Sequence, residues 1–402
     1  MTAELRGPTT RRSAVAMYTL LSVMFINILG FGIVVPLLPF YGASFHAPPW
    51  QIALIFSAYS IGSFIGEPFW GRLSDRVGRK PILVATVIAN CACYGALAFA
   101  PSIWIAFFIR LAGGMAAGNG SVVQGYIADV TPQEHLAGRM ARLGAAYNIG
   151  FILGPFVGGV LARPSAGPLG FQIPLLAASG LALLSAIGIA LAVKESRRGR
   201  GEGAGGPTPL AAMAMVVRHP VIGPLVLMVF LVGFAFNGIE SIFALWAHQR
   251  FAWQPREVGL CFGLSGLIAS PTQFFLTGTL SRRYGEARML ALGMAGTAIA
   301  MGLVPLVGAG WPIYALMAVM ALTSSVAFPN AGAMISRAVG EDNQGQIMGL
   351  SNAASAFSRF AGPQAASLFF AGVSLDSPFF MSALVVAPAV ALAIAAGRAA
   401  AR

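Results

Sequence analysis

Four ionisable side chains lie inside long apolar segments of this 402-residue chain: Glu67, Arg110, Glu240 and Arg359. Placing a charged side chain at the centre of a bilayer costs about 2.5–3.5 kcal/mol on insertion scales, so such residues usually take part in proton transfer, ion pairing or ligand binding. We predict that Glu240, Arg110 and Glu67 couple a reaction to protons. Arg359, near the middle of its segment, is expected to hold an anionic ligand or a gating acid.

Depth within the segments suggests which of these charges can meet. Glu240 lies about eight residues before the outer end of its segment, and Arg110 lies about eight residues after the outer start of its own, so both are roughly 12 Å deep at 1.5 Å per residue. We expect them to face each other across an outer cavity as a pair whose acid takes up protons. The alternatives remain open: each of them, or Arg359, can pair with a neighbouring polar group, and Glu67 can reach the nearby surface or join the charged loop that follows it.

That loop is a dense charge cluster between two apolar runs. Its sequence, GRLSDRVGRKPIL, spans Gly71 to Leu83 and returns in altered form as GTLSRRYGEARML from Gly278 to Leu290, an offset of 207 residues. Gly154-Pro155 likewise returns as Gly362-Pro363, at an offset of 208. Repetition at about half the chain length is typical of membrane transporters built from two similar bundles around a central site.

Composition requires that these charges be positioned by helices in lipid. The chain is 57% hydrophobic and 9% charged, with a mean hydropathy of +0.77, whereas soluble domains carry roughly 25% charged residues. Apolar runs long enough to cross a ~30 Å hydrocarbon core recur throughout. We predict an all-α integral membrane protein with about twelve spans, near residues 15–40, 51–71, 81–100, 102–130, 138–162, 171–193, 220–248, 256–280, 287–308, 311–338, 345–372 and 377–397.

Basic residues predict the orientation of these spans. Of the 25 Lys and Arg, 20 fall in the termini and the even-numbered connections, three in the odd-numbered connections and two within spans. This asymmetry is the positive-inside pattern. It predicts cytoplasmic termini in a multi-pass protein of the inner membrane, and it accounts for the net charge of +12 without nucleic acid. The first run is too long for a cleaved signal peptide and is interpreted as a spanning helix.

One long polar segment interrupts the series of apolar runs and divides the chain. Residues 194–218 are rich in Gly, Pro and Arg and lie at its midpoint, which is typical of a flexible linker. We predict an N-terminal six-helix bundle over 1–193, a cytoplasmic linker over 194–218 and a C-terminal six-helix bundle over 219–402. Cys91, Cys93 and Cys261 fall within predicted spans and have no metal-binding spacing. No phosphate-binding loop, metal cluster or catalytic triad is recognisable, so neither enzymatic activity nor a cofactor is expected.

The charged loop carries a family resemblance. The chain resembles a major facilitator superfamily transporter of the drug:proton antiporter type, which includes the tetracycline efflux pumps, over nearly its whole length. GRLSDRVGRKP matches the superfamily loop between helices 2 and 3, with Asp75 and Arg79 at its signature positions. GAAYNIGFILGPFVGG, from Gly144 to Gly159, matches the helix-5 motif of the exporters. Arg110 matches the family's membrane-embedded arginine, and YIADVTP at 126–132 matches the end of helix 4.

This resemblance implies a gating network at the loop. In the family, the acid at Asp75 lies near the N-terminus of helix 11, which begins here near Gly345, and the arginine at Arg79 pairs with the acid at Asp129. At the repeat offsets, Arg79 corresponds to Glu286 and Asp129 to Arg337, so both charges are inverted and the pair is expected to persist. The alternative is that these charges only fix topology and end the helices. The complete gating motif comprises Gly71, Asp75, Arg76, Gly78, Arg79, Asp129, Glu286 and Arg337.

The helix-5 motif places small residues at close helical spacing. Its members Gly144, Gly150, Gly154, Gly158 and Gly159 permit near contact between backbones, and Pro155 can bend the helix. The functional interpretation is a hinge or seal that favours outward release, and the alternative is ordinary helix packing in lipid.

The family's binding cavity is formed by helices 1, 4, 7 and 10, flanked by 2, 5, 8 and 11. Aromatic side chains beside a few amides suit an apolar ligand that is aromatic or cationic, although any single one of these residues can instead serve packing. Besides Glu240 and Arg359, the cavity candidates are Asn27, Phe31, Tyr59, Asn119, Gln124, Tyr147, Asn148, Asn237, Phe243, Gln273 and Asn330.

Two positions differ from the tetracycline pumps, which carry acids in helix 1 at the position of Asn27 and in helix 3 near Cys93. Neither residue is a carboxylate here, so a metal chelate of tetracycline is not expected, and proton coupling would need Glu240 or Glu67. We predict a monomeric transporter that exports small amphipathic or drug-like molecules by proton antiport with alternating access. The alternatives are an uncoupled facilitator, a dedicated metabolite exporter, and a non-transporting receptor or lipid-handling protein on the same scaffold.

Overall fold

The structure is a computed structural model that describes residues 8–117, 119–131, 133–196, 219, 221–338 and 344–400. Within these ranges the chain is almost entirely helical and contains no strand. The first part of the chain comprises α1 (Pro8–Val34), η1 (Val35–Leu37), α2 (Leu38–Ser44), α3 (Pro49–Val77), α4 (Arg79–Ala98), α5 (Ile103–Met115), α6 (Asn119–Asp129), α7 (Gln133–Leu161), η2 (Pro164–Phe171) and α8 (Gln172–Ala192).

The second part begins after the predicted linker, most of which lies outside the described residues. It comprises α10 (Ile222–Phe251), α11 (Pro255–Pro271), the π-helical turn η3 (Thr272–Thr277), α12 (Gly278–Tyr284), α13 (Glu286–Leu303), η4 (Val304–Leu306), α14 (Trp311–Ala338), α15 (Gln344–Gly372) and α16 (Ser377–Ala400).

Local sequence explains where several helices begin and end. Proline occupies the first turn of α3 and α11, where its missing N–H is not needed. Gln254 and Glu257 form a capping box at the start of α11, which satisfies two backbone donors. Gly78 and Gly285 end α3 and α12 with φ of 116° and 87°, a conformation that favours glycine. The same glycine turn therefore precedes α4 and α13, in agreement with the sequence repeat.

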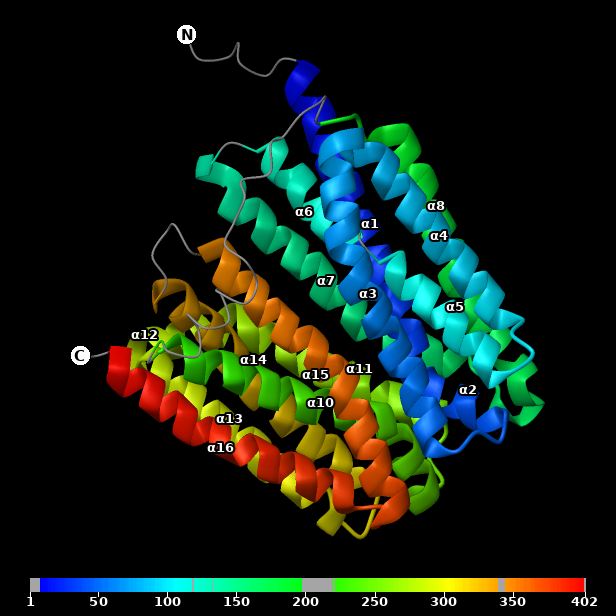
Figure 1. Cartoon of the computed structure of the whole chain (residues 1–402), viewed down its shortest axis with the longest axis vertical. Coiled ribbons are helices and arrows are strands. Elements are labelled where there is room, and N and C mark those ends of the chain that lie inside the picture. The colour runs from blue at the N-terminus through cyan, green and yellow to red at the C-terminus, as the bar shows by residue number, and fades with distance from the viewer. Residues whose placement is uncertain are drawn as a thin grey trace.

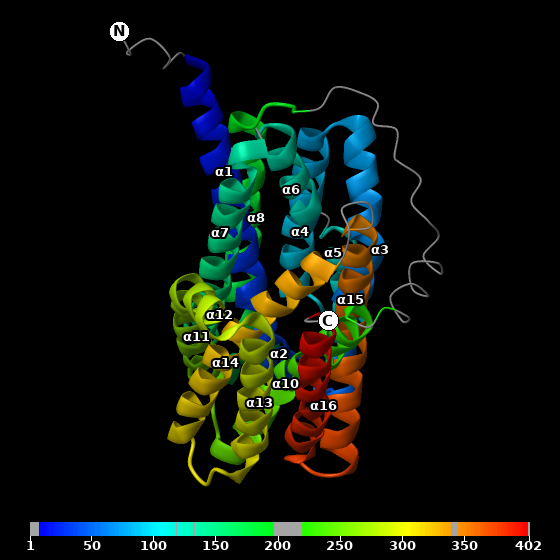
Figure 2. The same cartoon turned by 90° about the vertical axis from the view of Figure 1, so that its left-hand side faces the viewer.

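The helices pack in two groups with matching pairings. In the first group, α1 packs against α7 and α8, α3 against α5, and α4 against α8; in the second, α10 packs against α15 and α16, α11 against α14, and α13 against α16. Figures 1 and 2 show the first group above the second, with α3, α7, α11 and α15 along the boundary. Contacts between the groups are made mainly by α7 with α11 and by α3 with α15.

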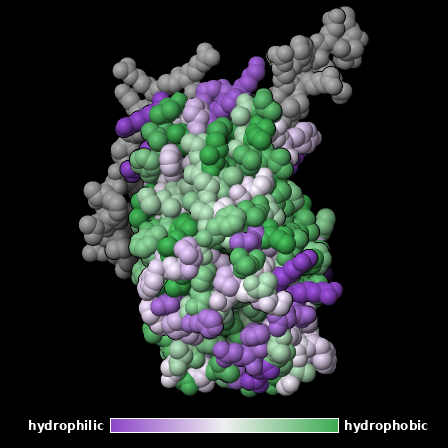
Figure 3. Space-filling view, turned by 90° about the vertical axis from the view of Figure 1, so that its right-hand side faces the viewer, coloured by the Kyte–Doolittle hydropathy of each residue, from purple (hydrophilic) through white to green (hydrophobic). Residues whose placement is uncertain are grey.

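The outer surface of the helices is apolar. Large hydrophobic side chains such as Leu191, Phe275 and Leu384 are at least 75% exposed, which would be unfavourable in water but suits contact with lipid. Figure 3 shows broad hydrophobic regions on one face of the molecule, separated by hydrophilic patches. Together with the apolar helices, this surface is that of a multi-pass membrane protein.

Ten helical segments in the described part of the chain are long and apolar enough to cross a membrane. The predicted number of twelve is therefore not confirmed by this criterion. The predicted span near 102–130 is divided between α5 and α6, and α5 is too short to meet it. The predicted span near 345–372 corresponds to α15, whose length is sufficient but whose N-terminal half carries several Ser, Asn and Gln residues.

Candidate functional site

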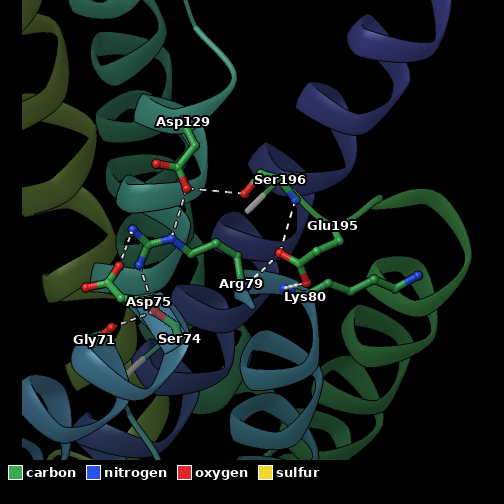
Figure 4. Close-up of polar contacts among 8 residues, drawn as sticks. All are labelled: Gly71, Ser74, Asp75, Arg79, Lys80, Asp129, Glu195 and Ser196. Atoms are coloured by element: carbon green, nitrogen blue, oxygen red, sulfur yellow. Dashed lines mark hydrogen bonds and ion pairs between the residues drawn. The ribbon is translucent and has the colours of Figure 1, made fainter. Parts of the chain in front are cut away.

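A cluster of polar contacts surrounds Arg79 at the first residue of α4 (Figure 4). Its guanidinium donates to Asp75 through Nη2 at 2.8 Å, to Asp129 through Nε at 3.1 Å and to the Ser74 hydroxyl through Nη1 at 2.7 Å. Arg79 is buried, with 7% of its surface exposed, and its charge is balanced by two carboxylates from α3 and α6. These contacts tie three helices together at one end of the first group. We call them the Arg79 network.

Space for this guanidinium is provided by a glycine. A Cβ added to Gly125 of α6 would lie 2.6 Å from Cζ of Arg79, well inside ordinary van der Waals contact. The Ser74 hydroxyl that accepts from Arg79 itself donates to the carbonyl oxygen of Gly71 at 2.7 Å. Arg76, also in the predicted gating motif, is exposed. The side chains at the start of α15, where Asp75 is expected to lie, are outside the described residues.

Two residues from the predicted linker extend the Arg79 network. The Glu195 carboxylate accepts from the backbone N–H groups of Arg79 at 2.7 Å and Lys80 at 3.1 Å, which caps the N-terminus of α4. The Ser196 hydroxyl donates to Asp129 at 3.3 Å, as Figure 4 shows. Sequence reasoning missed Glu195, because it assigned 194–218 to a linker. The signal available in the sequence was an acid in the basic segment that follows α8.

In the second group, the repeated positions also form an ion pair, but the acid and the base are exchanged. Arg337 of α14 donates to Glu286 of α13 at 2.8 Å, and the Arg337 side chain is 75% exposed. These are the two residues that correspond to Asp129 and Arg79 at the repeat offsets. Both line a cavity of about 610 Å³ between η3, α12, α13 and α14. Gln273 and Asn330, predicted for the substrate cavity, line this second cavity instead.

The glycines of α7 make close backbone contacts in two directions. Added Cβ atoms would lie 2.7 Å from the Phe25 carbonyl oxygen at Gly150 and 2.6 Å from Cα of Gly32 at Gly154, so these glycines face α1. Gly158 also faces α1, against Ile33. Gly144, at the start of the predicted motif, makes no such contact, because no described atom lies within 4 Å of an added Cβ there.

Gly159 reaches across to the other group. An added Cβ there would meet the carbonyl oxygen of Pro255 and lie 3.2 Å from Cα of Gly259 on α11. From the opposite side, a Cβ on Gly259 would lie 2.5 Å from the carbonyl oxygen of Pro155. This backbone-to-backbone contact, which we call the glycine seal, joins the end of α7 to the start of α11.

A central cavity of about 380 Å³ lies between the two groups. Nine of the predicted residues line it: Asn27, Phe31, Tyr59, Glu67, Arg110, Tyr147, Asn237, Glu240 and Arg359. Residues that the sequence did not single out complete much of the wall, among them Phe56, Ser60, Ser63 and Phe151. Ser60, Ser63 and Glu67 are spaced three and four residues apart on α3, which places them on one helical face. That spacing was the signal available in the sequence.

Arg110 and Glu240 both line this cavity, but they form no ion pair in the part of the chain that the structure describes. Arg110 is only 4% exposed and lies over the ring of Tyr59, with 4.4 Å between Cζ and the ring centroid. Its Nε is buried without a hydrogen-bond partner. The expected direct pair is therefore wrong for this conformation, because the aromatic ring, rather than the acid, holds the guanidinium.

Three predicted cavity residues lie elsewhere. Phe243 is fully buried among aromatic side chains, with its ring centroid 5.6 Å from that of Phe262 and 6.1 Å from that of Trp246. Gln124 and Asn148 are absent from the described wall of this cavity. The side chain of Asn119 lies outside the description.

Comparison with known proteins identifies the family. The model described as Major Facilitator Superfamily matches residues 20–276 and 225–400. The chain belongs to the Major Facilitator Superfamily. The predicted resemblance and fold class are thus confirmed, and the relatives of this superfamily member are transporters rather than enzymes.

The relatives include drug-resistance proteins. The chain is 27% identical over 368 residues to the class C tetracycline resistance protein of Escherichia coli, covering 89% of this chain and 90% of that protein. It is 26% identical over 373 residues to multidrug resistance protein 2 of Bacillus subtilis (strain 168), covering 91% of each. Among solved structures, a bacterial homolog of the human lysosomal transporter Spinster, inward-facing and unoccupied, matches with a TM-score of 0.76 at 17% identity, covering 98% of each chain.

Proposed function

We propose that this superfamily member exports small amphipathic, drug-like molecules across the bacterial inner membrane by proton antiport with alternating access. Its termini lie in the cytoplasm. Glu240 takes up the proton, and Arg110 is the cation that interacts with its ionised carboxylate. Glu67 is the second acid in the same cavity. The names of the drug-resistance relatives support the class of substrate, and the cavity supports the mechanism.

The observation that carries this proposal is the presence of Arg110 and Glu240 in one cavity, from different groups and without an ion pair. Neither Glu240 nor Arg110 has a hydrogen bond or ion pair to a described residue, although both lie within apolar helices. An unpaired carboxylate in such surroundings is least costly when it is protonated. Movement of the groups that brings Arg110 nearer would favour the ionised form and release the proton.

The contacts between the groups support an inward-facing state. Besides the glycine seal, the Ser57 hydroxyl of α3 donates to the carbonyl oxygen of Phe360 at 3.0 Å and accepts from the Gln364 amide at 3.0 Å. The seal and these bonds lie toward the ends of the helices that the positive-inside pattern places outside. The Arg79 network lies toward the opposite ends. A cavity closed outside and open inside is the loading state of an exporter.

The wall of the cavity supports an amphipathic substrate. Phe31, Phe56 and Phe151 offer apolar surface, while Asn27 and Asn237 offer amide groups. A few polar groups in an aromatic wall suit a ligand with one polar end. Asn27, an amide where the tetracycline pumps carry an acid, favours a second candidate function, an uncoupled exporter of a metabolite.

Proton release from inside-out vesicles tests the proposal. Vesicles with an acidic lumen would carry wild type, Glu240→Gln or Glu67→Gln, and a lumenal pH dye would follow the addition of cationic and neutral drugs. We expect a drug to release lumenal protons through wild type and Glu240→Gln to reduce this release at least tenfold. Arg256→Gln, at an exposed position at the start of α11, is the control and should match wild type.

Each other outcome counts against part of the proposal. Equal proton release by wild type and Glu240→Gln would move coupling to Glu67 or another acid. Drug uptake without proton release would establish the uncoupled exporter. Failure of every drug both to bind and to be transported would indicate a narrow metabolite substrate or a non-transporting role.

A further inference from the structure

The second cavity, between η3, α12, α13 and α14, is lined by more positive than negative side chains among the described residues. Arg282, Glu286 and Arg337 line it, and Glu286 pairs with Arg337 at 2.8 Å. Arg282 forms no hydrogen bond or ion pair with any residue of the described ranges. Arg337 contacts the acid through Nη2, which is one of the three nitrogens of a guanidinium with five N–H donors. The described lining of this cavity of about 610 Å³ thus carries two guanidinium groups and one carboxylate.

Comparison with the Arg79 network shows what this cavity lacks. At the repeat offsets, Arg282 stands where the first group has Asp75, and Arg337 stands where it has Asp129. In the first group, the space between these two acids is filled by the guanidinium of Arg79, 2.8 Å from one and 3.1 Å from the other. In the second group the corresponding residue is Glu286, which is shorter and reaches Arg337 only. The charges are inverted, and the space beside Arg282 is open.

The first group has a carboxylate at the glycine turn before α4, and the corresponding place in the second group holds no described side chain. The Glu195 carboxylate covers the glycine turn before α4, so closely that a Cβ on Gly78 would lie 2.5 Å from its Oε2. The corresponding turn at Gly285, which lines the second cavity, has no described atom within 4 Å of an added Cβ. The N-cap residue of α13 is Gly285, which offers no side-chain cap, and no side chain in the described ranges takes the place that Glu195 has at α4. The N–H groups and dipole of this helix end favour an anion.

We propose that this cavity binds the phosphate group of an anionic ligand between Arg282 and Arg337, next to the N-terminus of α13. Phosphate oxygens match guanidinium donors in charge and geometry. A bound phosphate joins α12 to α14 as the Arg79 guanidinium joins α3 to α6. Two sources share this chemistry: an anionic phospholipid headgroup at the cytoplasmic surface, and a free phosphate in solution.

Equilibrium binding to the purified full-length protein in detergent tests the proposal. The probes are a short-chain phosphatidylglycerol and inorganic phosphate, each titrated by calorimetry. We expect saturable binding of at least one probe, weakened about tenfold by Arg282→Gln because one charge-assisted contact is lost. Arg282→Lys, which keeps the charge, should bind more tightly than Arg282→Gln. Added salt should weaken binding.

Arg283→Gln is the matched control. Arg283 is the adjacent exposed arginine, it does not line the cavity, and it lies over the ring of Tyr284 at 5.4 Å. It should bind like wild type. Binding of phosphatidylglycerol alone would identify a lipid headgroup, whereas binding of inorganic phosphate as well would identify a free anion. Absence of saturable binding for both probes, or equal losses in Arg282→Gln and Arg283→Gln, would overturn the proposal.

Discussion

The two copies of the charged repeat reach similar backbone geometry with opposite electrostatics. In the first group a buried arginine, Arg79, is held by Asp75 and Asp129; in the second, a partly buried acid, Glu286, is held by one exposed arginine. The first arrangement fills its space, and the second leaves a cavity. A repeated turn therefore fixes where helices begin, whereas the side chains in it decide whether the helix ends are joined tightly.

Burial sets the expected energies of the two sites. Removing one partner of a buried ion pair leaves an uncompensated charge and is strongly destabilising, whereas exposed pairs contribute about 0–1 kcal/mol. Arg79 is buried and Arg337 is mostly exposed. Variants of the first site should therefore have larger effects than matched variants of the second.

The largest effect in this comparison is expected from Gly125→Ala. The added methyl group would take space now filled by the Arg79 guanidinium, 2.6 Å away at Cζ, and would displace it from both acids. We expect unfolding free energy to fall by about 1–3 kcal/mol, as for overpacking, and drug transport in vesicles to fall about tenfold.

The second group offers the matched variant, because the residue at the offset position is already alanine. Ala333→Gly should cost about 1 kcal/mol through helix propensity alone and leave transport close to wild type. If Gly125→Ala transports as well as Ala333→Gly, the Arg79 network is not needed for transport.

A smaller effect is expected from Glu195→Ala. The variant removes the carboxylate that caps α4, and loss of a helix cap costs about 1 kcal/mol. Hydrogen exchange should show less protection at the first turn of α4, while α13, where no described side chain takes the place of Glu195, should be unchanged. Equal protection of α4 in wild type and variant would show that the cap contributes nothing measurable.

The smallest effect is expected at the inverted pair. Glu286→Arg and Arg337→Glu should each reduce stability by about 0.2–1 kcal/mol, the range for exposed pairs, and the double variant should recover most of the loss. Thermal unfolding of the four proteins gives the coupling energy as a double-mutant cycle. Losses that simply add in the double variant would show that these residues interact too weakly to matter.

Sequence predicted the family, the fold class and most helices, because long apolar runs and the loop motif are local signals. It also placed nine residues that line the central cavity, since charged and amide groups inside apolar helices are conspicuous. It could not predict that Arg110 lies over Tyr59, or that Phe243 packs among aromatics instead of facing the cavity. Both depend on how helices rotate and pack, which one sequence does not encode locally.

The glycine seal limits how substitutions can change the ratio of inward-facing to outward-facing molecules. Because Gly159 and Gly259 meet through backbone atoms, no side chain there can be exchanged for a slightly larger or smaller one. Any substitution adds at least one methyl group at a contact of 3.2 Å to the facing Cα and acts as a wedge. A shift of 1.4 kcal/mol between two conformations changes their ratio about tenfold. We therefore expect single substitutions at this contact to change the ratio of inward-facing to outward-facing molecules in steps rather than gradually.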